Sequence, residues 1–111
     1  MAKFDAYEVS LQLIPALRPI VTAIALHDRS LADQIRRAGS SVPLNVAEGA
    51  RRSGKDRNHS YRIAAGSAAE VRAALSVARG WEYVDATQAR AADELLDRVL
   101  ALLWRLTHPR R

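Results

Sequence analysis

The sequence predicts an all-α protein in which four amphipathic helices pack as one antiparallel, up-down-up-down four-helix bundle. Hydrophobic residues make up 49% of the 111 residues and aromatic residues only 5%, a balance that suits closely packed helices better than a β-sheet. Four segments with helical periodicity each follow a spacing typical of a helix start. The chain contains no cysteine, which excludes a disulfide framework and a thiolate metal site. At this length we expect a single domain over residues 1–111.

The first helix is predicted over residues 6–26, after the capping spacing Asp5-x-x-Glu8. Its apolar face is wide, as expected for a helix with neighbours on two sides. Two adjacent stripes form that face: Phe4, Tyr7, Leu11, Ile14 and Val21 on one, and Leu13, Leu17, Ile20 and Ile24 on the other. Pro15 and Pro19 each remove a backbone hydrogen bond and crowd the carbonyl four residues back. We therefore expect a bend there, with a break as the alternative.

The second helix is predicted over residues 31–52, after Ser30-x-x-Asp33, because its apolar residues recur alternately four and three positions apart. Pro43 interrupts this pattern. The carbonyl that Pro43 crowds belongs to Gly39, which has no Cβ to add to the clash. We therefore expect one kinked helix rather than two helices.

The third helix is predicted over residues 56–83, after Ser53-x-x-Asp56, and its apolar seam is the most regular of the four. Its middle, residues 64–69, is nearly all small, so we expect another helix to approach closely there, with Gly66 serving this packing.

The fourth helix is predicted over residues 86–106, after Asp85-x-x-Gln88. The connections between the predicted helices are short, which makes sequential helices antiparallel neighbours.

The net charge of +5 is concentrated in the middle of the chain. Residues 29–62 contain eight basic and three acidic residues, whereas the rest of the chain contains nine of each. A local basic excess indicates an anionic partner, and an ordinary solvated surface is the alternative. The candidate nucleic-acid-binding residues cluster around the turn between the second and third helices: Arg51, Arg52, Lys55, Arg57 and Arg62. No aromatic platform is interleaved among them, so we expect contacts mainly to phosphates.

A second group of polar residues follows one side of the second helix and a comparable line on the third. Its members are Arg37, Ser41, Asn45, Glu48, Ser67 and Glu70. With the turn centred near residues 53–54, antiparallel pairing places Arg37 opposite Glu70 and Ser41 opposite Gly66. The same pairing places Asn45 opposite Arg62. We interpret the group either as a polar network that fixes helix register or as a ligand or RNA site.

Residues that would support catalysis are sparse. His27, His59 and His108 have no partner at a spacing suited to metal binding, so we expect no metal and no cofactor. The sequence contains no Gly-rich phosphate loop, nucleophile elbow or paired-carboxylate motif, and we expect no enzymatic activity. The N-terminus lacks a signal pattern, and no uncharged apolar run is long enough for a membrane span. We expect a soluble, cytoplasmic protein.

Two blocks of sequence resemble the bacterial four-helix-bundle proteins encoded in intervening sequences of large-subunit ribosomal RNA genes. The first block runs from Gln34 to Gly49 and reads QIRRAGSSVPLNVAEG, and the second runs from Ile63 to Glu70 and reads IAAGSAAE. Together they cover about a quarter of the chain in the family's order, and the helix layout agrees over nearly all the rest. The prolines of the first helix depart from the family pattern.

The resemblance implies an up-down-up-down bundle that forms a ring-shaped homo-oligomer, most often a pentamer, without catalysis. It also implies association with ribosomal RNA, because of where the founding genes lie. A related bundle is the accessory protein of diversity-generating retroelements, which binds a reverse transcriptase and nucleic acid. Our leading hypothesis is therefore a non-enzymatic oligomeric scaffold that binds nucleic acid, RNA rather than DNA, through the basic turn. The alternative is a protein-interaction adaptor, for example an accessory subunit of a reverse transcriptase.

Overall fold

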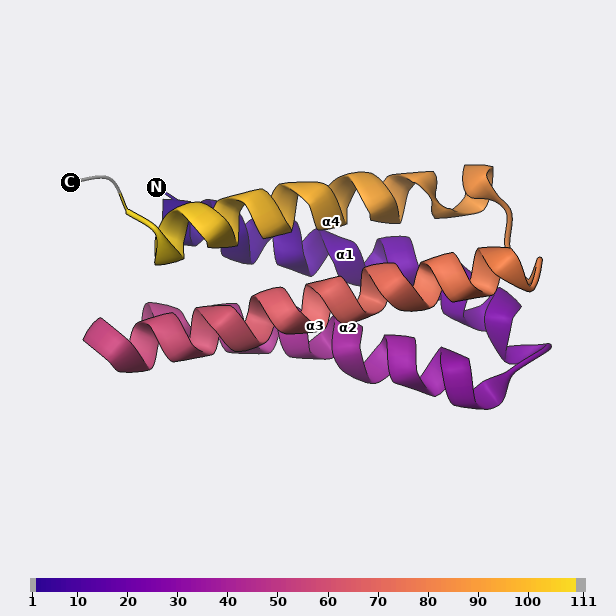
Figure 1. Cartoon of the computed structure of the whole chain (residues 1–111), viewed down its shortest axis with the longest axis horizontal. Helices are drawn as coiled ribbons and strands as arrows, with labels where there is room; N and C mark the ends of the chain where they lie inside the picture. The colour runs from indigo at the N-terminus through magenta and orange to yellow at the C-terminus, as the bar shows by residue number, and fades with distance from the viewer. Residues whose placement is uncertain (1, 110–111) are drawn as a thin grey trace.

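The computed structural model describes residues 2–109, with side chains from Asp5 onward, so the predicted role of Phe4 lies outside the described residues. The described chain forms four helices and no strand: α1 (Ala2–Ala25), α2 (Arg29–Ala50), α3 (Gly54–Gly80) and α4 (Ala86–Thr107). They lie side by side along an axis of 45 Å, as Figure 1 shows. α2 and α4 each contact both α1 and α3. The predicted all-α four-helix bundle is confirmed.

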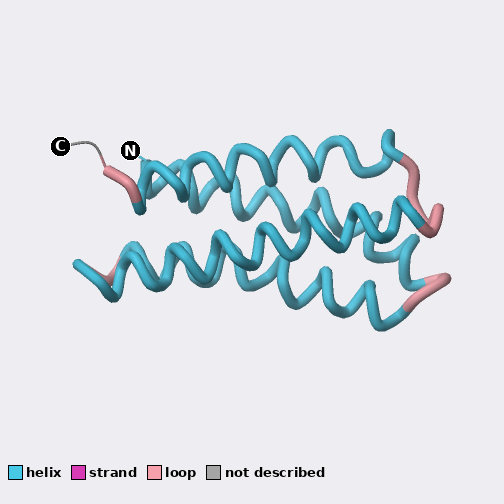
Figure 2. Tube along the Cα trace, in the orientation of Figure 1, coloured by secondary structure: helices cyan, strands magenta, loops and turns pink. Residues whose placement is uncertain are grey.

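The turns divide between the two ends of the bundle, as the loops in Figure 2 show. The α1–α2 and α3–α4 turns lie at one end. The α2–α3 turn lies at the other end, together with the start of α1 and the end of α4 (Figure 1). The residues predicted to bind nucleic acid therefore share one end of the molecule with the C-terminal part of α4.

The start of α4 follows the predicted capping box. The Asp85 carboxylate accepts from the Gln88 backbone N–H at 2.8 Å, and the Gln88 side chain accepts from the Asp85 N–H at 2.8 Å. Ser53 precedes α3 as predicted, but its side chain makes no capping hydrogen bond among the described residues. The backbone carbonyl of Ser53 accepts from the Arg57 N–H instead, at 3.3 Å.

The other two predicted helix starts are wrong. α2 begins after Asp28, not Ser30, because the Asp28 carboxylate accepts from the Leu31 N–H at 2.9 Å from an extended backbone. A carboxylate at this position also stabilises the positive end of the helix dipole, so it competes well with the serine hydroxyl. α1 begins at Ala2, and Asp5 lies within its first turn rather than before it.

The prolines do not break the helices that contain them. α1 runs continuously through Pro15 and Pro19, so the break considered as an alternative does not occur. Both rings lie on the exposed side, where water can bond the carbonyls that lose an amide partner. α2 is likewise one helix through Pro43, as predicted. Gly39 has a further role, because a Cβ there would lie 2.9 Å from Leu17 Cδ1 on α1.

The core is a continuous cluster of aliphatic residues from all four helices, with Tyr61 as its largest fully buried side chain. The Tyr61 ring packs on Gly49, where a Cβ would lie 2.5 Å from Tyr61 Cε1. In the stretch 64–69, Ala64 and Ala68 are fully buried and Ser67 contacts Ser41 of α2, but the predicted packing role of Gly66 is wrong. Gly66 is exposed, and a Cβ there would meet no atom of the described chain within 4 Å.

Of the helices described, α1 is the one whose segment Asp5–Ala25 is long and apolar enough to cross a membrane by composition alone. Core helices of soluble proteins often meet the same criterion. Here Leu13, Leu17, Ile20 and Ile24 belong to the bundle core.

Candidate nucleic-acid interface

The α2–α3 turn carries three exposed cationic side chains, Arg51, Arg52 and Lys55. α2 ends at Ala50, and Gly54 opens α3 with a φ of +58°, a backbone conformation that favours glycine. Two of the cations share one carboxylate. Glu48 accepts from Arg52 Nε at 2.5 Å and from Arg51 Nη2 at 2.7 Å.

The Glu48 carboxylate is held in its charged form. The hydrogen bonds from Arg52 and then Arg51, with the charges of both, lower the pKa of Glu48 below its usual value of 4.5. The Arg51 side chain is nevertheless 77% exposed, so its guanidinium stays within reach of a second anion. Lys55 has no carboxylate partner within 4 Å in the described part of the chain.

Arg57 and Arg62 do not join this exposed group. Arg57 is half-buried, and its Nε donates to the carbonyl oxygens of Arg52 at 2.8 Å and Gly49 at 3.3 Å. The Gly49 carbonyl lies in the last turn of α2 and the Arg52 carbonyl in the turn that follows, so Arg57 closes the end of α2 against the start of α3. Arg62 lies further along α3 and lines a pocket shared with α4. The structure thus brings together Arg51, Arg52 and Lys55, and separates the other two predicted residues from them.

The predicted polar group of α2 and α3 divides into separate contacts. The Ser67 hydroxyl donates to the Ser41 hydroxyl at 2.8 Å, and Asn45 Nδ2 donates to the same Ser41 oxygen and to its backbone carbonyl, both at 2.9 Å. This half-buried cluster links α2 to α3. Glu48 is not part of it, because that carboxylate pairs with the arginines of the turn.

The predicted pairing of Arg37 with Glu70 is wrong. Glu70 accepts from Gln34 Nε2 at 3.3 Å, one helical turn before the predicted partner. Arg37 is exposed and forms no ion pair within the described residues. Ser41 meets Ser67 rather than Gly66, so the two helices do not follow the antiparallel register that the prediction assumed.

Two stacked aromatic pairs lie at opposite ends of the bundle, and the sequence reasoning did not single out either. At the end of the bundle that carries the α2–α3 turn, Trp104 stacks on His108 with ring centroids 4.3 Å apart and an interplanar angle of 10°. At the opposite end, His27 stacks on Tyr83 at 5.0 Å, and Trp81 lies next to Tyr83. The spacing of four residues between Trp104 and His108 was the available sequence signal, because residues four apart are neighbours on a helix.

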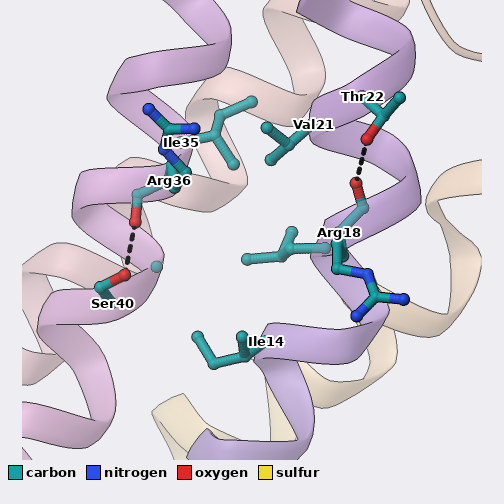
Figure 3. A pocket seen from close by; sticks show the side chains of 9 residues that line it. Ile14, Arg18, Val21, Thr22, Ile35, Arg36 and Ser40 are labelled. Atoms are coloured by element: carbon teal, nitrogen blue, oxygen red, sulfur yellow. Dashed lines mark hydrogen bonds between the residues drawn. The ribbon is translucent and has the colours of Figure 1, made fainter.

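A groove of about 400 Å³ runs between α1 and α2 (Figure 3). It is lined by apolar residues of both helices, among them Ile14, Leu17 and Val21 of α1 and Ile35 and Gly39 of α2. Figure 3 shows Ile35 of α2 directed toward Val21 of α1. The hydroxyls of Thr22 and Ser40 at its rim donate to carbonyls of their own helices, at 3.1 and 2.8 Å.

Within residues 2–109, no three His, Cys, Asp or Glu side chains lie close enough together to hold a metal ion. The arrangement defines a class of protein, an antiparallel four-helix bundle with a basic turn at one end. The family model described as 23S rRNA-intervening sequence protein matches residues 2–105. The chain therefore belongs to the 23S rRNA-intervening sequence protein family, as its two sequence blocks indicated.

A solved structure shows the same fold. It is the crystal structure of a protein with unknown function from the S23 ribosomal protein family of Bacteroides thetaiotaomicron. The similarity covers 97% of this chain and 99% of that chain, with a TM-score of 0.89 and 19% sequence identity. Comparison with curated proteins finds no match.

Proposed function

We propose that the protein is a non-enzymatic, oligomeric scaffold that binds nucleic acid, RNA rather than DNA, through its basic α2–α3 turn. The observation that carries this proposal is the concentration of charge: residues 29–62 hold the whole net charge of +5, and three of their exposed cations gather at one turn. Membership of a family described by a ribosomal RNA intervening sequence supports RNA as the partner.

Binding at this turn would be electrostatic. Guanidinium groups bind phosphate oxygens through paired N–H donors, and Lys55 adds a point charge. Glu48 competes with the nucleic acid, because it already engages both Arg51 and Arg52. Phosphate contacts carry no base information, so discrimination between sequences should be poor and affinity should fall with salt.

Oligomer formation is supported by the amount of exposed surface. The chain exposes 6945 Å², whereas a compact monomer of 12.2 kDa exposes about 6,100 Å². We place the contact between copies at the α1–α2 groove, where Ile14 is exposed and Leu11, three residues before it on α1, adds exposed apolar surface. The family resemblance implies a pentamer. A ring would repeat the basic turn, and several weak sites on one particle would add by avidity.

The oligomer is tested by light scattering on the parent and on Ile14→Glu. A parent mass of several subunits and a smaller mass for Ile14→Glu are expected. Leu26→Glu is the matched control, because Leu26 is an exposed leucine near the α1–α2 turn, outside the groove. A monomeric parent contradicts the oligomer, and an unchanged mass for Ile14→Glu contradicts the assigned contact.

Nucleic-acid binding is tested by changing the competing carboxylate. Glu48→Gln should strengthen binding to a structured RNA by up to about fivefold, because a freed guanidinium can pair with phosphate and a surface ion pair contributes little. Glu82→Gln makes the same change of net charge at the opposite end and should have little effect. The measurement is fluorescence anisotropy at two salt concentrations.

The complementary variant replaces Arg51, Arg52 and Lys55 with glutamine and should lose RNA binding without unfolding. Arg57 stays in place, because it holds the end of α2. Circular dichroism is the folding control. Equal RNA affinity of the parent and the folded triple variant contradicts the proposed interface.

A protein-interaction adaptor, such as an accessory subunit of a reverse transcriptase, is the second candidate. One observation favours it: the end opposite the basic turn exposes Leu26 and Trp81 beside the His27–Tyr83 stack. Exposed aromatic clusters are typical centres of protein interfaces. Absence of binding to any nucleic acid at low salt would favour this second function.

A further inference from the structure

The exposed Trp104–His108 pair at the end of α4 has no role in the bundle core. Trp104 is 61% exposed, a large exposure for an indole, and His108 is also exposed. The two rings are nearly parallel, with their centroids 4.3 Å apart. The pair therefore presents a flat aromatic surface to solvent rather than a side chain packed into a hydrophobic site.

The local backbone fixes this surface. His108 Nδ1 lies 3.0 Å from the Trp104 carbonyl oxygen, which can only accept, so this nitrogen donates the hydrogen bond. The Thr107 hydroxyl lies 3.0 Å from the Leu103 carbonyl and donates to it. Both bonds reach carbonyls in the last turn of α4, and the Trp104 carbonyl also accepts from the His108 backbone N–H at 2.9 Å. The imidazole is thus held against the indole by the way in which the helix ends.

Positive charge lies beside the aromatic surface. Arg62 of α3 lines the same shallow pocket as Trp104 and His108, between α3 and α4. Lys55 precedes Arg62 by seven residues, two turns of helix, so both residues lie along one line of α3. This line connects the aromatic pair to the α2–α3 turn at the same end of the bundle (Figure 1).

We propose that Trp104 and His108 form a stacking platform for an unpaired base of a single-stranded nucleic acid, with Arg62 and Lys55 contacting the adjoining phosphates. The inference rests on the proposed nucleic-acid function and makes it more specific, because the basic turn alone would contact only phosphates. Every base has a π-face, so such a platform accepts single strands of any sequence. A duplex keeps its bases stacked inside, so the platform favours loops and unpaired ends over continuous helices.

The experiment compares an oligothymidylate with an abasic deoxyribose-phosphate oligomer of the same length, which carries equal charge but no bases. The protein carries Trp81→Phe, so that Trp104 is its one tryptophan and its fluorescence reports the platform directly. We expect the oligothymidylate to quench Trp104 and to bind at least about fivefold more tightly, the low end of a single base stack. Trp104→Ala in otherwise parent protein should bind both oligomers with equal affinity, and Trp104→Phe should retain the preference.

The possible failures are distinguishable. If both oligomers bind equally to the Trp81→Phe protein, the platform is refuted and the phosphate-binding turn stands. If neither oligomer binds at low salt but a structured RNA does, the platform is refuted; if the structured RNA also fails to bind, the proposed nucleic-acid function itself is refuted. If Trp104→Ala changes the mass measured by light scattering, Trp104 is a contact between copies, and this also overturns the platform.

Discussion

Replacing Gly49 with alanine tests a close contact between α2 and α3. Gly49 lies in the last turns of α2, and the fully buried ring of Tyr61 from α3 packs on it. A Cβ at this position would lie 2.5 Å from Tyr61 Cε1 and 2.7 Å from Cδ1. The ring is rigid and enclosed, so relieving the overlap requires α2 and α3 to separate or Tyr61 to leave its rotamer.

Two opposing effects set the size of the change. Alanine is a better helix former than glycine by up to about 1 kcal/mol, and less near a helix end. Overpacking a core typically costs about 1–3 kcal/mol. We therefore expect Gly49→Ala to lower the free energy of unfolding by about 1–2 kcal/mol. For a domain of this size, each kcal/mol lowers Tm by about 4–8 °C.

Gly66→Ala is the matched control. Gly66 is in the interior of α3, and a Cβ there meets no described atom within 4 Å. The same substitution should therefore raise the free energy of unfolding by about 0.5–1 kcal/mol. Urea unfolding followed by circular dichroism measures both variants at equal protein concentration, because the stability of the proposed oligomer would depend on concentration. If Gly49→Ala is as stable as Gly66→Ala, the contact with Tyr61 does not determine how closely α2 approaches α3.

Three further predictions concern two ionisable groups, Tyr61 and Glu48. The Tyr61 hydroxyl is buried without a hydrogen-bond partner among residues 2–109, so Tyr61→Phe should raise the free energy of unfolding by about 1 kcal/mol. A lower free energy of unfolding for this variant in urea melts would contradict the prediction. Burial raises the pKa of Tyr61 above 10.0, so above that pH the phenol ionises in the unfolded chain before it ionises in the folded protein. The free energy of unfolding should therefore fall as the pH rises above 10.0, and Tyr61→Phe should not show this fall. The lowered pKa of Glu48 implies that its ion pairs with Arg51 and Arg52 stabilise the fold above pH 4.5. This stabilisation should be lost as the pH falls and the carboxylate becomes protonated. NMR titration should show this pKa returning toward 4.5 when Arg51 and Arg52 become glutamine, and an unchanged pKa would contradict the pairing.

The helices and their order could be predicted from the sequence, because periodicity averages over many residues. The predicted range 86–106 differs by one residue from the end of α4 at Thr107, and α2 was correctly predicted to continue through Pro43. Helix starts were less predictable, since one hydrogen bond decides them. Asp28 replaced Ser30 as the cap of α2 because its carboxylate reaches the Leu31 amide. A capping spacing alone does not show which of two nearby oxygens will be used.

The candidate site was predictable only as far as local spacing extends. The clustering of Arg51, Arg52 and Lys55 follows from their positions beside one turn. The use of Arg57 to close α2 depends on the path of the turn, which brings its Nε to the Arg52 carbonyl. The position of Arg62 beside Trp104 depends on the packing of α3 against α4, two helices whose register no single motif encodes.

The charges of the turn explain why an oligomer matters to the proposed function. Residues 48–57 contain four basic and two acidic side chains, a net charge of +2. Each neutralised phosphate of a single strand contributes about −0.7 to the slope of log affinity against log salt, so one turn accounts for a slope of only about −1 to −2. If several copies hold one nucleic acid, their slopes add, and the total becomes several times steeper. The salt slope therefore reports how many turns act together. A slope near that of one turn, measured on a protein whose mass is that of several subunits, would mean that each subunit binds alone and that the ring contributes nothing to affinity.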